Sequence, residues 1–200
     1  MNNKKLLACL MMFITLLFPA FRAPVVSEKY VVDKKESLVT WKGSMALASK
    51  GQHVGYVYFS KGDLILEKGQ LTGGSFEIDM NTITDPVHGS DNNLIQHLKD
   101  PDFFDVVKFP ATTFIISKVK AATGSAIDIT GNLTIKGITH EVTFPAQLEL
   151  IGGVVNASGK LNIDRSKWDV RYGSATFFNN LADDTISNEI EFDIKIVARK

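Results

Sequence analysis

The stretch NLIQHLKDPDFFDVVKFPATTF, residues 93–114, runs from a short amphipathic segment through a Phe-Phe pair and Phe-Pro into a strand-like run. Pro101 cannot continue a helix, because its ring removes a backbone donor and clashes with the preceding turn. We therefore expect a helix over 92–99, opened by a capping region at Ser90 and Asp91. The aromatic pair then leads into a strand. This stretch predicts a lid that feeds a β-sheet.

The segments on both sides of this stretch alternate polar and apolar residues. Residues 189–196 do so through four repeats, and 75–80, 127–135 and 139–150 do so more loosely. Such alternation is typical of strands with one wet face and one apolar face. Turn-forming residues between the runs predict short hairpin connections, at 61–63, 68–69, 73–74, 123–125, 136–137 and 152–153. The pattern indicates an antiparallel, all-β meander in one domain, and by itself leaves a barrel and a sandwich open.

The N-terminus predicts export. Lys4 and Lys5 precede an uncharged apolar run over 6–18, which is the plan of a secretory signal peptide and is too short to span a bilayer. We expect residues 1–23 to be the signal peptide, with cleavage somewhere in 20–27, and residues 24–200 to be the mature domain. The location is then periplasmic or secreted.

Composition excludes several classes of partner and chemistry. Removing Lys4, Lys5 and Arg22 leaves 19 basic residues against 22 acidic ones. With no basic stripe, nothing favours a nucleic acid partner. Cys9, the only cysteine, lies inside the signal region, where we expect no lipid attachment. The mature chain therefore has no disulfide, and its stability must come from its core.

The order and spacing of several motifs resemble the YceI-like family, which comprises exported lipocalin-like barrels that hold polyisoprenoids and other long apolar chains. One departure is the long link at 85–92, and another is that Ile95 and Gln96 replace the family's usual Arg-Asp pair. The resemblance therefore carries over no head-group contact from that Arg. The motifs are Ser37-x-Val39-x-Trp41-x-Gly43, His53-x-Gly55, Gly74-x-Phe76-x-Ile78, Gln96-His97-Leu98, Asp102-Phe103-Phe104-Asp105, Phe109-Pro110-x-x-x-Phe114, Gly131-x-Leu133-Thr134-Ile135 and Ile163-Asp164-Arg165-x-x-Trp168.

The resemblance implies a single antiparallel barrel of about eight strands with one helix or lid segment. The implied function is non-catalytic: transport, storage or scavenging of a polyisoprenoid, an isoprenoid quinone or a related amphiphile. Ten Phe residues lie outside the signal region. The Phe ring carries no polar group, so it suits apolar contact with a long-chain ligand. The candidate ligand-binding residues are Trp41, Phe59, Phe76, Ile78, His97, Phe103, Phe104, Phe109, Phe114, Leu133, Ile135, Arg165, Trp168 and Phe177.

Two alternatives stay open. A lipid-acting hydrolase could use the region of His88, Ser90 and Asp91, although neighbours in sequence do not make a catalytic relay. A barrel filled by its own side chains could act as a stress or structural protein. We expect no catalytic residue, no metal site, since the histidines lack ligand spacing, and no cofactor. The partners compatible with a lipid carrier are its ligand, a membrane in transient contact, and a second copy in a homodimer.

Overall fold

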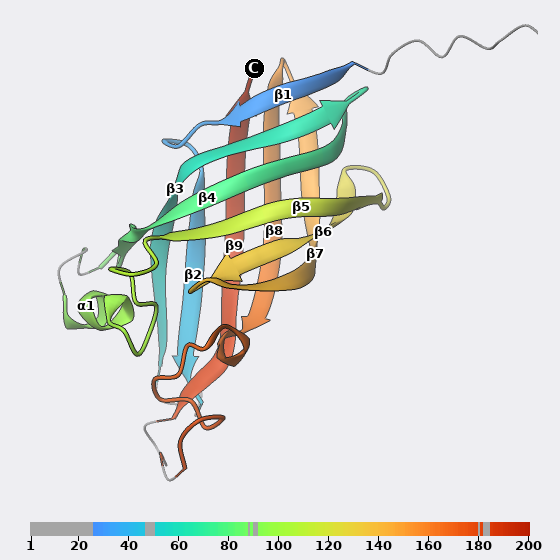
Figure 1. The fold of residues 1–200 in the computed structure, drawn as a ribbon. Helices are drawn as coiled ribbons and strands as arrows, with labels where there is room; N and C mark the ends of the chain where they lie inside the picture. The colour runs from blue at the N-terminus through green and yellow to red at the C-terminus, as the bar shows by residue number, and fades with distance from the viewer. Residues whose placement is uncertain (1–25, 47–50, 88, 90–91, 180, 182–184) are drawn as a thin grey trace, which may run out of the picture.

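The computed structural model describes residues 26–46, 51–87, 89, 92–179, 181 and 185–200. The expected signal peptide lies outside these residues, as do His88, Ser90 and Asp91. Nine strands, one α-helix and one 3-10 helix make up the described fold (Figure 1). The elements are β1 Ser27–Val32, β2 Leu38–Met45, β3 Gln52–Glu67, β4 Gln70–Thr84, α1 Asn93–Lys99, β5 Ala111–Ala121, β6 Ala126–Ile135, β7 Ile138–Ile151, β8 Val154–Asp164, η2 Arg165–Trp168 and β9 Ile186–Arg199.

The strands close into one antiparallel barrel. Each strand from β3 to β8 pairs with the next along the chain, and β8 pairs with β9. The strand β2 completes the ring between β9 and the first half of β3. The strand β1 continues the position of β2, pairing with 63–67 of β3 and with the end of β9. The nine strands therefore fill eight positions, and the predicted eight-stranded barrel is confirmed.

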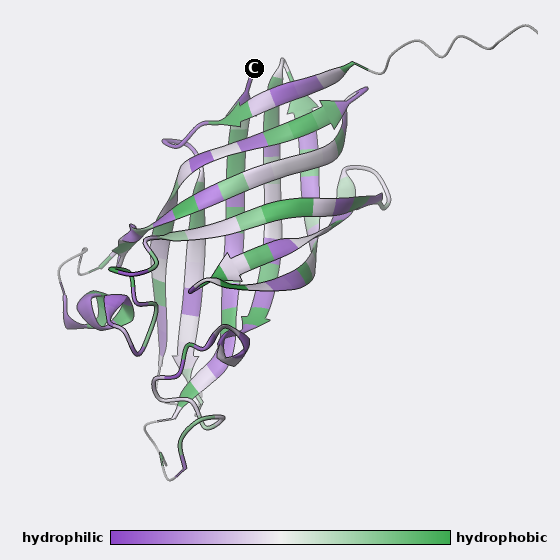
Figure 2. Cartoon of the chain, in the orientation of Figure 1, coloured by the Kyte–Doolittle hydropathy of each residue, from purple (hydrophilic) through white to green (hydrophobic). Residues whose placement is uncertain are grey.

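Hydrophobic and hydrophilic residues both occur along each strand (Figure 2), and in β8 buried or half-buried residues alternate with exposed ones. The hairpin turns predicted at Lys68 and Gly69 and at Lys136 and Gly137 are confirmed. All four residues have φ between 50° and 77°. Two central residues with positive φ form the turn type whose twist matches that of the flanking strands.

Two predicted turns are wrong, because residues 61–63 lie inside β3 and residues 73–74 lie inside β4. At both places glycine allows close approach instead. A Cβ on Gly62 would lie 2.8 Å from Cδ1 of Phe76, and a Cβ on Gly74 would lie 2.6 Å from the carbonyl oxygen of Asp63. Glycine inside a strand often marks such a contact.

The helix α1 forms where it was predicted, but its cap differs. The side chain of Asn92, rather than Ser90 or Asp91, accepts a hydrogen bond from the amide of Ile95 at 3.0 Å. Ile95 and Leu98 face the barrel and are buried, while the Nζ of Lys99 donates to the carbonyl oxygen of Asn81 on β4. The helix therefore covers one side of the barrel near one end. The 3-10 helix η2 was not predicted.

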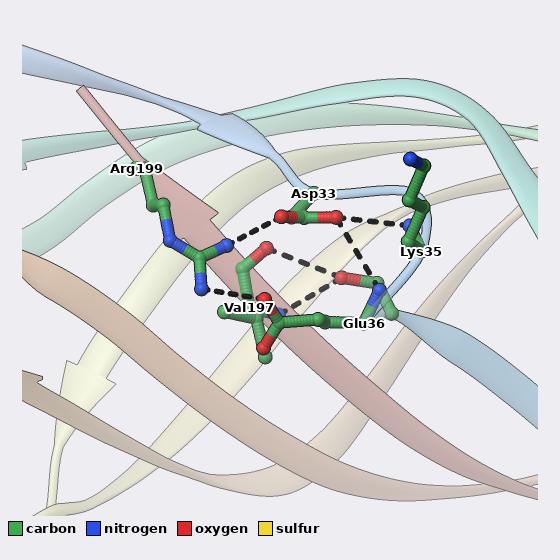
Figure 3. A network of polar contacts seen from close by, with 6 residues as sticks. Asp33, Lys35, Glu36, Val197 and Arg199 are labelled. Carbon is green, nitrogen blue, oxygen red and sulfur yellow. Dashed lines mark hydrogen bonds and ion pairs between the residues drawn. The ribbon is translucent and has the colours of Figure 1, made fainter.

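A polar network lies at the opposite end of the barrel (Figure 3). The hydroxyl of Ser37, which is fully buried, donates to the carbonyl oxygen of Val197 and accepts a hydrogen bond from its amide. Arg199 forms ion pairs with Asp33 and with Glu36, the latter at 2.6 Å. The backbone amides of residues 35 and 36 also hold the Asp33 carboxylate. These contacts fasten the start of β2 to the end of β9.

Candidate ligand-binding cavity

An apolar cavity of ≈ 180 Å³ lies inside the barrel. Its walls come from strands β2 to β9, and side chains of α1, of the segment after α1 and of η2 border one end. Its polar lining residues are few: Thr112, Ser158, Ser187 and Arg165. A concave site of this kind, apolar with few polar groups, suits an apolar ligand.

Ten of the fourteen candidate ligand-binding residues border this cavity. The structure thus brings together side chains from five strands, from the segment after α1 and from η2. Whether these side chains contact a ligand stays a prediction. The ten residues are Trp41, Phe59, Phe76, Ile78, Phe103, Phe104, Phe114, Leu133, Ile135 and Arg165.

The other four candidates lie outside the cavity lining. The ring of His97 packs edge-on against Tyr172, with centroids 4.1 Å apart, on the outer side of Phe103. Phe109 lies against the turn at Gly137. Trp168 is buried and donates its indole N–H to the carbonyl oxygen of Leu133, and Phe177 lies beside Arg171 on the surface. These four side chains contact other parts of the protein and do not form part of the cavity wall.

Arg165 is a cation buried at the edge of the cavity. Only 1% of the residue is exposed, and its guanidinium donates to the carbonyl oxygens of Ser187, Val170 and Ile186 at 2.9, 3.0 and 3.3 Å. Burial lowers the pKa of Arg165 to about 10, and the negative charge of Asp164 partly opposes this shift. The side chain therefore stays charged at neutral pH. It joins β9 to the loop after η2 through these three hydrogen bonds.

An aromatic cluster covers the cavity at this end. The ring of Phe103 lies 5.5 Å from the guanidinium carbon of Arg165 and 5.4 Å from the ring of Phe104. Phe103 is 6% exposed, whereas Phe104 is only partly buried. The Nζ of Lys136 donates to the carbonyl oxygens of Pro101 and Asp169, so it fastens the lid segment to the loop after η2. Phe103 is thus the more deeply buried and better-anchored of the two rings.

One buried polar atom of the wall has no partner among the described residues. The indole N–H of Trp41 is buried without an acceptor, although the ring borders the cavity. The ring lies across Gly55, where a Cβ would collide with Cζ2. Glycine at this position therefore makes room for the tryptophan that forms part of the wall.

Sequence reasoning missed the small residues of the wall. Ala146, Ala157 and Gly159 border the cavity on β7 and β8. The alternation of β8 could have revealed the last two, because they share the inward face with the buried Leu161 and Ile163. The expected ligand contacts were mostly aromatic side chains, whereas these residues matter for the space they create.

The described part of the chain holds no group of three or more His, Cys, Asp or Glu side chains placed to bind a metal ion. Nor do the same residues form a helix with the length and apolar character needed to cross a bilayer.

The YceI-like domain family matches residues 30–198, nearly all of the described barrel. The chain belongs to the YceI-like family. Among its relatives, the protein YceI of Salmonella agona is 31% identical over 141 residues, which cover 68% of this chain and 69% of the relative. The protein YceI of Salmonella arizonae is 31% identical over 128 residues, covering 62% and 63%. The matched region thus spans about two thirds of these YceI proteins.

Solved structures share the fold of this YceI-like chain. BcnA of Burkholderia cenocepacia superposes with a TM-score of 0.69 at 24% identity, covering 83% of this chain and 98% of BcnA. A polyisoprenoid binding domain from Saccharophagus degradans superposes with a TM-score of 0.61 at 13% identity, covering 85% and 97%. At these identities the likeness establishes the barrel architecture alone.

Proposed function

We propose that this YceI-like protein is a non-catalytic carrier that holds one long apolar chain inside its barrel. The observation that carries the proposal is the closed barrel with an apolar internal cavity. The name of the structurally similar Saccharophagus degradans domain supports a polyisoprenoid as the class of ligand. An isoprenoid quinone or a related amphiphile would offer the cavity the same apolar chain.

The signal-like N-terminus supports export to the periplasm or beyond. An exported carrier must take up its ligand from a membrane, and the loops at the lid end expose apolar side chains. Val107 is 97% exposed, and Tyr172, Phe177 and Phe178 are also exposed. We include transient contact of this end with a bilayer in the proposal, because aromatic side chains favour the boundary between apolar and aqueous phases.

Binding of a prenol tests the function directly. Titration of the purified mature protein with geranylgeraniol, followed by native mass spectrometry, should give a 1:1 complex. Lipids extracted from protein purified out of its own cells should contain a single class of long-chain compound. Absence of both signals in folded protein would favour the barrel filled by its own side chains. Turnover of a lipid ester that His88→Ala or Ser90→Ala abolishes would favour the hydrolase.

A further inference from the structure

We infer that Ala146 and Ala157 set the longest apolar chain that the cavity accepts. This inference rests on the proposed ligand-binding function and adds to it a limit on ligand length. Three features carry it: the small residues of the β7–β8 wall, the closed end of the barrel and the length of the cavity between that end and the lid.

The inward residues of β8 change size along the strand. Leu161 and Ile163 lie toward the lid end, Ala157 and Gly159 follow, and Val155 lies at the closed end. The space beside Gly159 is taken by the ring of Phe144, since a Cβ there would lie 2.8 Å from Cε2 of that ring. Ala157, by contrast, borders the cavity with no more than a methyl group.

Ala146 on β7 enlarges the same chamber. It pairs with Gly159, and a Cβ on Gly159 would lie 3.5 Å from the Cβ of Ala146. On the other side of β8, the larger side chains of Ile194 and Ile196 border the cavity from β9. Two alanines in a wall of Ile, Leu and Phe therefore create the room at the deep end.

The cavity ends just beyond this chamber. Val155 pairs with Ala198 on β9, and both are fully buried without bordering the cavity. Tyr30 and Leu66 are also buried outside the lining at this end. The ion pairs of Arg199 fasten the strand end that carries Ala198 (Figure 3). Sheet pairing and a polar network hold these residues in place, so this end of the cavity should move less than the loops at the lid end.

The length of the cavity follows from the strand geometry. Ser187 borders the cavity near Arg165, and Ile196 borders it beside Ala157. The nine residue steps between them on β9 correspond to roughly 30 Å of strand, or roughly 23 Å along the axis at a strand tilt of about 40°. A cavity of ≈ 180 Å³ over this length is narrow, so it can hold at most one chain, in single file. The end of that chain should lie against the two alanines.

Leucine at either position should therefore shorten the accepted chain. The substitution places three additional carbons where the end of the ligand would lie, and it leaves the cavity wall nearer the lid unchanged. A long ligand would then leave part of its chain in water, and burial of a few methylene groups is worth about tenfold to a hundredfold in dissociation constant. A short ligand that ends before the chamber should bind as before.

The test compares chain-length profiles of Ala157→Leu, Ala146→Leu and the wild-type protein. The probes are geraniol, farnesol, geranylgeraniol and longer prenols, and dissociation constants are measured by displacement of a fluorescent prenyl probe. The control is Asn156→Leu, because Asn156 is exposed on the outer face of the same strand. Wild-type affinity should rise with length and then level off.

Both cavity variants should level off at a shorter prenol and lose at least about tenfold for the longest bound one, while Asn156→Leu should follow the wild type. Ala157→Val, which adds two carbons, should give an intermediate profile and serves if a leucine variant fails to fold. An unchanged profile, or an equal loss at every length, in folded variants would overturn the inference and leave the carrier function standing. Failure of the wild-type protein to bind any prenol would overturn the carrier function itself.

Discussion

Truncating Phe103 to Ala should destabilise the ligand-free protein more than truncating its neighbour Phe104. Phe103 is 6% exposed, and its ring contacts the rings of His97, Phe104 and Tyr172 and faces the guanidinium of Arg165. Removing a buried Phe side chain costs about 3–5 kcal/mol. Phe103→Ala also removes the cation–π interaction with the desolvated guanidinium. We therefore expect the free energy of unfolding to fall by about 4 kcal/mol.

Phe104 is partly buried and borders the same cavity, so roughly half of that cost, about 2 kcal/mol, is expected for Phe104→Ala. Its loss should instead weaken prenol binding by about tenfold, as expected when a side chain covers the ligand more than it supports the fold.

The assay is urea unfolding of both variants without ligand, with binding of geranylgeraniol measured on the folded proteins. Phe178→Ala provides the control, because Phe178 is 48% exposed and should change the free energy of unfolding by less than about 0.5 kcal/mol. An equal or larger loss of stability for Phe104→Ala would refute the assignment of Phe103 as the anchoring ring. Normal prenol binding by Phe104→Ala would refute its role as a cover.

Three further variants test other contacts. Ser37→Ala removes the acceptor of the buried Val197 amide and should lower the free energy of unfolding, measured in urea, by about 1–3 kcal/mol. An unchanged midpoint would contradict the role of this pair in joining the start of β2 to the end of β9. Trp41→Phe removes an unpartnered indole N–H, which should stabilise the protein, and part of a buried ring, which should destabilise it. The free energy of unfolding should therefore change by less than about 1 kcal/mol, and a much larger decrease would mean that the indole has a partner. Backbone amides, chiefly that of Lys35, and Arg199 hold the pKa of Asp33 below its usual range. The carboxylate therefore stabilises the fold above about pH 4, and this contribution is lost as the pH falls through the lowered pKa. Asp33→Asn should make the free energy of unfolding depend less on pH in the acid range. An unchanged pH dependence would count against the network.

Local sequence signals were enough for parts of β4, β6, β7 and β9, for α1 and for the hairpin turns at Lys68 and Lys136. The alternation at 189–196 gave β9 its inner and outer faces, and Lys136 and Gly137 formed the turn that their sequence predicts. These features depend on residues one to four positions apart, whose backbone preferences and side-chain directions act without help from distant parts of the chain. Seven of the candidate ligand-binding residues that border the cavity lie on strands, where inward positions follow from the same alternation.

The tertiary structure decided what each side chain meets. Gly62 resembles a turn residue in sequence, yet it lies inside β3, where Phe76 of the next strand leaves no room for a Cβ. Arg165 could have pointed into the cavity or into the loops, and its burial followed from carbonyl oxygens of β9, about twenty residues away. The chamber beside Ala157 exists because β7 and β8 bring small residues next to one another in the wall. Packing of this kind depends on strand register around the whole barrel, which no local pattern specifies.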